Sequence, residues 1–330
     1  MEKISVIIPV FNAQDTINQT VDSIKAQTYK DWEIILVNDG STDDSLEICK
    51  SLENERIHVI DKKNGGAVSA YKKGIQNATC DLIAFCDADD RYKPDYLERA
   101  MKIMQEQNCD FVTFGCSIIE SNKETIGKNA ALEGFYDKER IQKEILTHCL
   151  FNDYIPGSYY SISVYRVTKV FRKELVMRFV DQLDENCSQL EDNIFTTLTI
   201  LNAQSFFVDN HSVYDYLIRP QSMSSHCSEN LIDKYIYSLS VIKKLADKYL
   251  ADYNPKQFNF LAYENFRICF RRIAKVSDYK TARKAIQKMR ESGWIDCVKF
   301  GEIRLLKNYL FYFLYHCRIN FLLYICFKYL

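Results

Sequence analysis

The run Leu82-Ile83-Ala84-Phe85-Cys86-Asp87-Ala88-Asp89-Asp90 decides the fold of this chain. Its first five residues are apolar at every position, which is typical of a strand covered on both faces of a sheet. Carboxylates follow directly at the carboxyl end of that strand, where open α/β sheets bind ligands. Mg²⁺ takes one or two carboxylates and completes its shell with water and phosphate oxygens. The run therefore predicts a metal–diphosphate site, with an Asp-rich turn or a helix N-cap as the alternative.

Segments on both sides of this run alternate between strand-like and helix-like patterns. Strand-like apolar runs cover residues 5–9, 32–37, 57–60 and 110–116. Helical patterns cover residues 15–27, 43–52, 66–77 and 94–107. Such alternation implies a largely parallel sheet with right-handed crossovers and helices on both faces. The first part of the chain therefore predicts an α/β fold of the Rossmann-like kind.

The pattern loosens after about residue 120. The sequence predicts a helix over residues 138–150, an acidic helix start and apolar stretch over 183–201, strands over 205–208 and 212–217, and helices from about 226 to the end. We therefore expect one α/β domain over residues 1–225 and a helical region over residues 226–330.

Charge and cysteine usage exclude several classes of protein. The 330 residues carry 43 Lys and Arg against 44 Asp and Glu, so no overall field favours nucleic acid as a partner. The 12 cysteines include no Cys-x-x-Cys pair, which disfavours a zinc site and a compact disulfide framework. Reduced thiols and the absence of a signal-peptide pattern at the N-terminus predict a cytoplasmic protein.

Three further segments end strands with polar residues. The first strand ends Pro9-Val10-Phe11-Asn12, a polar turn. The second delivers Asp39 into a Gly-Ser-Thr turn, where its carboxylate can accept hydrogen bonds from a nucleobase or ribose, with ordinary turn chemistry as the alternative. Asn64-Gly65-Gly66 is a loop that leads into a helix, and its backbone N–H groups can approach an anion.

The order of these motifs resembles the family 2 glycosyltransferases, which have the GT-A fold. The likeness rests on Pro-x-Phe-Asn, Val-Asn-Asp-Gly-Ser-Thr-Asp, Asn-x-Gly and Asp-Ala-Asp-Asp, in that order. It covers residues 3–114 closely and continues more loosely to about residue 225. The resemblance divides the domain into a nucleotide-sugar half, residues 1–116, and an acceptor and catalytic half, residues 117–225.

The resemblance also assigns roles to the motif residues. A nucleotide-sugar would be held by Pro9, Phe11, Asn12, Asp39, Asn64, Gly66 and Asp87. Asp89 would be the main ligand of a divalent cation, Mn²⁺ or Mg²⁺, and Asp87 would contact the ribose or the sugar. The chain departs from the family in the helix after Gly66, where Tyr71 and Lys72 stand in place of an Arg-Asn pair.

A second acidic motif, Glu191-Asp192-Asn193-Ile194-Phe195, resembles the family segment whose Asp is the catalytic base. An acceptor hydroxyl is a poor nucleophile until a positioned carboxylate takes its proton, which is the role implied for Asp192. The alternative is an acidic first helical turn, a common position for such residues. We expect Phe195 to serve packing rather than chemistry.

Basic residues and histidines further along give weaker signals. Leu217 stands where the family carries an Arg, and Arg219, two residues later, is a candidate for holding a phosphate or simply a surface arginine in a turn. Lys169 matches a basic position of the family, so the resemblance makes it an acceptor-side candidate. His211 and His226 are candidate metal ligands, although a structural role is expected for a lone histidine.

The C-terminal tail begins at Leu305 and ends at Leu330, and it is rich in Leu, Phe and Tyr. Polar residues interrupt it, so no apolar run reaches the ~20 residues that span a bilayer. One interpretation is a pair of amphipathic helices at the inner surface of an anionic membrane, favoured by the excess of basic residues. The other is a helical cap on the domain or an oligomer contact.

The sequence thus predicts an inverting glycosyltransferase, a hexosyl- or N-acetylhexosaminyl-transferase. The resemblance implies transfer from a nucleotide-diphosphate sugar, a UDP-sugar, to a hydroxyl of a glycan or lipid-linked glycan in surface polysaccharide synthesis. The alternatives are a sugar nucleotidyltransferase and a nucleotide-sugar-binding protein without activity.

Overall fold

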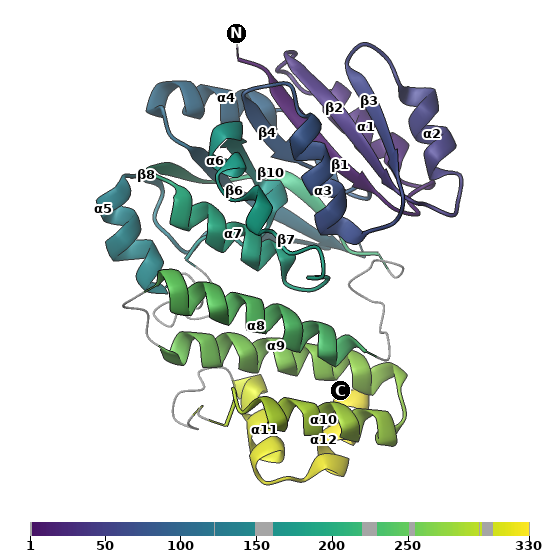
Figure 1. Ribbon diagram of the computed structural model, residues 1–330, viewed down its shortest axis with the longest axis vertical. Helices are drawn as coiled ribbons and strands as arrows, with labels where there is room; N and C mark the ends of the chain where they lie inside the picture. Colours follow the sequence, from purple (N-terminus) through teal and green to yellow (C-terminus); the bar gives the residue numbers. More distant parts are fainter. Residues whose placement is uncertain are drawn as a thin grey trace. The chain divides into compact units, whose positions relative to one another are not determined.

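The computed structural model describes residues 2–121, 123–148, 161–219, 230–250, 255–296, 298 and 306–329 (Figure 1). The chain divides into two compact units. Unit 1 comprises Met1–Ile145 and Ile162–Arg219, and unit 2 comprises Leu146–Ser161 and Pro220–Leu330. The boundary predicted at residue 225 lies outside the described residues.

Unit 1 holds the α/β sheet and its helices. In chain order its elements are β1 (Ile4–Val10), α1 (Ile17–Lys25), β2 (Trp32–Asp39), α2 (Ser45–Leu52), β3 (Ile57–Lys62), α3 (Gly66–Asn77), β4 (Leu82–Phe85), β5 (Arg91–Tyr92), α4 (Tyr96–Gln107), β6 (Phe111–Glu120), β7 (Lys123–Gly127), β8 (Gly134–Tyr136), α5 (Lys138–Arg140), a π-helical segment (Ile141–Ile145), a 3-10 turn (Arg166–Thr168), β9 (Lys169–Arg172), α6 (Lys173–Met177), a second 3-10 turn (Val180–Gln182), α7 (Glu191–Asn202) and β10 (Phe206–Leu217).

The sheet begins with parallel strands and becomes mixed. Its order is β3-β2-β1-β4-β9-β6-β10-β5, with β7 paired to β6 and β8 paired to β10. β3, β2, β1 and β4 pair in parallel, as the alternating pattern predicted. β9 lies antiparallel between β4 and β6, so the later half of the chain extends the same sheet.

Helices cover both faces of the sheet, which confirms the predicted α/β architecture. Phe111 and Phe114 of β6 are three residues apart, so they point to opposite faces. Phe111 stacks on Phe171 of β9, which packs edge-on against Phe195 of α7. Phe114 packs against Tyr96 of α4 on the other face. Apolar side chains thus cover both faces of the sheet at β6 and β9.

A close approach of backbone fixes α3 on the parallel strands. A Cβ atom at Gly74 would lie 2.3 Å from Cγ2 of Ile7 in β1, so only glycine lets the helix pack at this distance. This contact holds the loop before α3 near the carboxyl ends of β1 and β2.

Several boundaries differ from the sequence predictions. The helix predicted over residues 138–150 begins as α5, continues as the π-helical segment and ends in a 3-10 turn, Leu146–His148. The two strands predicted over 205–208 and 212–217 form the single strand β10, whose register shifts between Val208 and Asp215. The shifts let one continuous strand bend. Polar residues at the bend interrupt the apolar pattern, so the sequence predicted two strands.

Unit 2 is helical, as predicted. Its longer helices are α8 (Leu231–Tyr249), α9 (Pro255–Val276), α10 (Tyr279–Ser292), α11 (Leu306–His316) and α12 (Asn320–Tyr329). The tail thus forms two helices, α11 and α12, which agrees with both interpretations of its sequence. Within the described parts of the chain, none of the helices combines the length and the apolar character that crossing a bilayer requires.

Candidate active site

The acidic run lies where the sequence placed it, directly after β4. Asp90 is almost fully buried, and both of its carboxylate oxygens accept hydrogen bonds from β10. The Tyr214 hydroxyl donates to Oδ2 and the Leu217 N–H donates to Oδ1, each at 2.8 Å. Asp87 and Asp89 are only half-buried. Asp90 therefore anchors the loop, while Asp87 and Asp89 remain accessible to a ligand.

A buried arginine joins the acidic run to the second acidic motif. Arg166 lies in the 3-10 turn before β9, and only 5% of its side chain is exposed. Its Nη1 lies 2.6 Å from Oδ1 of Asp192, and its Nη2 lies 3.6 Å from Oδ1 of Asp87. The guanidinium also lies 4.4 Å from the ring centroid of Tyr71. The two carboxylates predicted to serve donor and acceptor thus share one cation.

Two carboxylates of the acidic run, Asp87 and Asp89, favour protonation more than ordinary ones. Burial raises the pKa of Asp87, and the neighbouring Asp192 and Asp89 raise it further, whereas Arg166 opposes the rise. Burial also raises the pKa of Asp89, which the charge of Arg219 opposes. An additional positive charge beside these carboxylates would favour their ionised form.

Helix α7 holds Asp192 in its first turn. Leu190 precedes the helix in the left-handed region with φ of 59°, which turns the chain sharply before Glu191. Three residues after Asp192, Phe195 is fully buried and packs edge-on against Tyr71 and Phe85. The predicted packing role of Phe195 is confirmed, and this anchor fixes the helix start beside Arg166.

Tyr71 is not exposed at the surface of the sheet edge. It is fully buried in the same aromatic cluster, at the position where the family carries an Arg. Lys72 pairs with Glu185 at 3.1 Å and donates to the Leu183 carbonyl at 3.2 Å. The departure from the family motif thus serves packing and the support of a neighbouring loop.

The loop before α3 is organised by Asp39 at the end of β2. The Asp39 side chain accepts hydrogen bonds from Gly65 N–H at 2.9 Å, Gly66 N–H at 2.7 Å and Lys62 Nζ at 2.5 Å. The Asn64 amide donates to the Asp39 carbonyl at 2.8 Å. The structure therefore brings Asp39, Asn64 and Gly66 together, with both oxygens of Asp39 already engaged by the loop.

The end of β1 lies beside this loop. The Asn12 N–H donates to Ser41 Oγ at 3.1 Å, and Asn12 Oδ1 accepts from Thr42 N–H at 2.8 Å. Phe11 is 44% exposed, and Pro9 pairs with Val37 of β2. Because β2, β1 and β4 are adjacent and parallel, their carboxyl ends form one edge of the sheet, where the predicted nucleotide-sugar residues gather.

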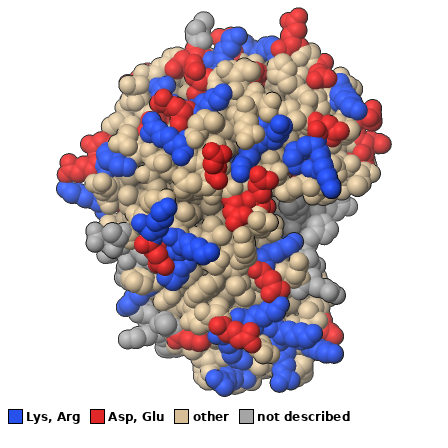
Figure 2. Space-filling model, viewed as in Figure 1, with Lys and Arg blue, Asp and Glu red and all other residues tan. Residues whose placement is uncertain are grey.

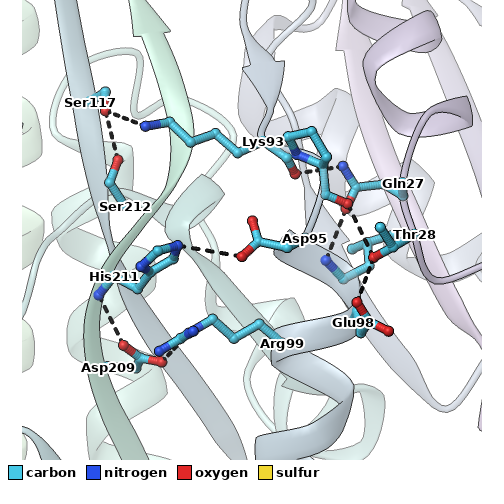
Figure 3. Close-up of polar contacts among 12 residues, drawn as sticks. Gln27, Thr28, Lys93, Asp95, Glu98, Arg99, Ser117, Asp209, His211 and Ser212 are labelled. Atoms are coloured by element: carbon cyan, nitrogen blue, oxygen red, sulfur yellow. Dashed lines mark hydrogen bonds and ion pairs between the residues drawn. The ribbon is translucent and has the colours of Figure 1, made fainter.

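A polar network fixes the segment that follows the acidic run (Figure 3). Arg99 of α4 pairs with Asp209 of β10 at 2.5 Å, and His211 lies 3.4 Å from Asp95. Lys93 donates to Ser117 of β6 at 2.8 Å. His211 thus contributes to a structural network, as expected for a lone histidine, and His226 lies outside the described residues.

Lys169 is not available to an acceptor, in contrast to the sequence hypothesis. Its side chain is fully buried, and its Nζ donates to the carbonyls of Ser163 at 2.5 Å and Tyr165 at 2.8 Å. These bonds hold the segment that carries Arg166. Burial lowers the pKa of Lys169 to about 7.

This lowered pKa gives a testable dependence of stability on pH. Between about pH 7 and pH 10 the unfolded chain binds a proton at Lys169 that the folded protein does not, so the free energy of unfolding rises with pH. In the variant Lys169→Met this contribution, up to about 1.4 kcal/mol per pH unit, should disappear. Urea unfolding at pH 7, 8 and 9 measures it, with Lys73→Met on the exposed face of α3 as control. Equal slopes in wild type and Lys169→Met would contradict the assignment.

The donor set fits a divalent cation bound together with a phosphate ligand. Across the described ranges, no three His, Cys, Asp or Glu side chains form a ready metal cluster. Mg²⁺ and similar hard cations need only one or two protein carboxylates when water and phosphate oxygens supply the rest. Asp89, with Asp87 beside it, meets that requirement at the edge of the sheet.

Comparisons with known proteins agree with this architecture. Residues 5–166 match the family model Glycosyl transferase family 2. A relative named Glycosyltransferase GlyA, from Streptococcus pneumoniae serotype 4, is 26% identical over 90% of this chain and 45% of its own length. The Putative teichuronic acid biosynthesis glycosyltransferase TuaG of Bacillus subtilis is 38% identical over 38% of this chain and 51% of its own length. The chain thus spans about half the length of these curated relatives.

Among solved structures, TarS 1-349 of S. aureus in complex with UDP superposes with a TM-score of 0.64. The match covers 99% of this chain and 90% of that one at 17% identity, so it bears on the fold. The motif order, the sheet and these matches agree. Residues 5–166 therefore match glycosyltransferase family 2, and the fold is the GT-A fold of this solved structure.

Proposed function

We propose that this chain transfers a sugar from a UDP-sugar to a hydroxyl of a glycan or lipid-linked glycan, with inversion at the anomeric carbon. The observation that carries the proposal is the link from Asp87 through the buried Arg166 to Asp192. It joins Asp87, at the edge of the sheet where the sugar donor is proposed to bind, to Asp192, a partly exposed carboxylate that an acceptor could reach. One relative, named for teichuronic acid biosynthesis, supports surface polysaccharide synthesis as the setting.

Asp192 is the proposed general base. It takes the proton of the acceptor hydroxyl while that oxygen forms a bond to the anomeric carbon. The bond from that carbon to the diphosphate oxygen breaks on the opposite side, which inverts the configuration. Asp192 later returns the proton to solvent. Arg166 holds the carboxylate in place, and 29% exposure of the Asp192 side chain leaves it open to an acceptor.

The donor is proposed to lie along the edge formed by the ends of β1, β2 and β4. Pro9, Phe11 and Asn12 flank the nucleotide, and the loop that Asp39 organises offers its Asn64 and Gly66 to the same ligand. Asp89 would hold Mn²⁺ or Mg²⁺, which when bound neutralises charge on the leaving diphosphate. Arg219 follows β10 near Asp89 and would add a further positive charge for the phosphates.

The first test concerns metal-dependent binding. Asp89→Ala should abolish the Mn²⁺-dependent part of UDP affinity and leave the fold intact, because Asp89 is half-buried and supplies the proposed ligand oxygen. Calorimetric titration of UDP with and without Mn²⁺ measures it. Asp22→Ala is a matched control, since Asp22 is 70% exposed on α1. Retention of the metal-dependent affinity in Asp89→Ala would remove Asp89 from the site.

Product analysis separates the proposal from its alternatives. A glycosyltransferase releases UDP from a UDP-sugar, and an acceptor accelerates the release. A sugar nucleotidyltransferase would instead form or consume pyrophosphate with a nucleoside triphosphate. A protein that only binds nucleotide-sugar would release neither product.

A further inference from the structure

Charge is distributed very unevenly along this nearly neutral chain. Residues 255–330 contain 15 Lys and Arg against 5 Asp and Glu, a net charge of +10. Since the whole chain carries −1, the first 254 residues carry −11. Such a separation of charge points to an anionic partner for the C-terminal helices rather than for the whole protein.

The same region exposes large apolar side chains. Of the 16 such side chains exposed in the described residues, six belong to α11, α12 and their connection, so they are concentrated there rather than scattered. They are Leu310, Phe313, Ile319, Phe321, Leu322 and Tyr329. Phe313 is 54% exposed and Phe321 is 59% exposed. Residues 306–329 contain no Asp or Glu.

The inner side of this helical hairpin is firmly packed, so the outer side chains are held outward. Arg290 of α10 donates to the Tyr315 carbonyl at 2.8 Å and to Asn320 Oδ1 at 2.9 Å. Tyr324 donates to the Ser277 carbonyl at 3.0 Å, and Leu323 is fully buried. These contacts fix both helices against α10 and the end of α9.

Basic residues of α10 adjoin the exposed aromatic residues. Tyr279, at the start of α10, packs edge-on against Phe321 with 5.2 Å between ring centroids. Lys280, Arg283 and Lys284 follow on the same helix and are exposed. Within unit 2, Figure 2 shows Lys and Arg side chains over the area of α10 and α12, with fewer acidic side chains among them. Exposed cations therefore lie within about one helical turn of an exposed apolar surface.

We propose that α10 and the α11–α12 hairpin form a surface that binds an anionic lipid bilayer. Phe313, Phe321 and Leu322 would enter the boundary between headgroups and acyl chains, and the α10 cations would contact lipid phosphates. Aromatic and aliphatic side chains flanked by Lys and Arg are the composition that holds helices in this interface. The contact is independent of sugar transfer.

A second copy of this chain is the less favourable occupant of the surface. In a two-fold dimer the same patch faces itself, so the basic helices of both copies would be brought together. Their like charges would oppose the contact, whereas an anionic bilayer attracts them. The positive charge of α10 therefore favours binding to an anionic bilayer over self-association.

Vesicle co-sedimentation of the full chain tests the proposal. Wild type should bind vesicles of phosphatidylcholine with 30% phosphatidylglycerol (about a third anionic lipid) and should bind pure phosphatidylcholine far less. Lys280→Glu/Lys284→Glu should weaken binding at least about tenfold, since each basic residue near the surface contributes about 1 kcal/mol. Phe321→Ser/Leu322→Ser should weaken binding at low and high salt alike, because apolar insertion is not screened.

Matched controls come from unit 1. Lys73→Glu/Lys102→Glu, at exposed sites on α3 and α4, changes the net charge as much as the α10 variant does, and Ile126→Ser, 45% exposed on β7, controls for apolar exposure. Neither should alter vesicle binding. UDP release from a soluble donor and acceptor should remain unchanged in both α10 and α12 variants. Wild-type protein that stays off anionic vesicles, variants that bind as wild type does, or a dimer dispersed by Phe321→Ser/Leu322→Ser would each overturn the proposal.

Discussion

Replacing Asp192 with Asn should lower turnover by about 10²–10⁴-fold, the range for loss of a general base. That loss corresponds to about 3–5 kcal/mol of activation free energy. The amide keeps the size of the side chain, and its oxygen can still accept the bond from Arg166 Nη1, but it cannot take a proton at working pH. UDP affinity should hardly change, because Asp192 is proposed to serve the acceptor.

Steady-state UDP release with a saturating acceptor measures the effect, and Glu191→Gln provides the matched comparison. Glu191 is the adjacent carboxylate of α7, and burial raises its pKa. Its amide variant should keep most of the turnover. If Asp192→Asn retains a third of wild-type turnover while Glu191→Gln loses most of it, Glu191 is the base.

The sheet edge was predictable because its signals are local. Each parallel strand reads as a short apolar run, and each ends in residues that favour turns, so Asp39 and Asp87 could be placed at strand ends from neighbours alone. The adjacency of these ends followed from the alternation of strands and helices. Asp192 required the family resemblance, since an acidic first helical turn is common.

The buried positions of Arg166 and Lys169 could not be predicted from the residues around them. Arg166 meets Asp192 26 residues away and Asp87 at an even greater separation, so nothing in its own surroundings marks it. Lys169 belongs to a four-residue strand that begins and ends with a basic residue, which does not read as a buried strand. The family resemblance suggested an acceptor-side role for Lys169, and a fully buried lysine is rare.

Asp39 illustrates a function that only the fold discloses. The sequence offered a choice between ligand contact and turn chemistry. In the structure its oxygens accept bonds from Gly65, Gly66 and Lys62, so its immediate effect is to shape the loop. Which partners a carboxylate finds depends on a loop that lies 26 residues further along the chain.

Removing the Arg166 cation should cost stability as well as activity. In Arg166→Met the methionine side chain can still pack on Tyr71, but Asp87 and Asp192 lose the guanidinium that lies near both. Breaking a buried ion pair on one side costs about 3–5 kcal/mol. Because Asp87 remains 40% exposed and water offsets part of the loss, we expect the lower end, about 3 kcal/mol. Urea unfolding at pH 8 measures it.

Arg99 provides the matched control for this prediction. It pairs with Asp209 at 2.5 Å, as closely as Arg166 pairs with Asp192, yet 41% of its side chain is exposed. Arg99→Met should therefore cost less than Arg166→Met, although more than the loss of a fully exposed pair, because the Asp209 side chain is only 10% exposed. Equal losses in Arg99→Met and Arg166→Met would show that water, rather than the guanidinium, balances the carboxylates.

A double-mutant cycle then isolates the pair. If Arg166 chiefly offsets Asp192, the loss caused by Arg166→Met should shrink by about 0.5–3 kcal/mol in an Asp192→Asn background, where one carboxylate is already neutral. Losses that simply add would mean that Arg166 stabilises the turn by packing on Tyr71 and Phe85. In that case the two carboxylates would be energetically independent, and the proposed link from donor edge to base would fail.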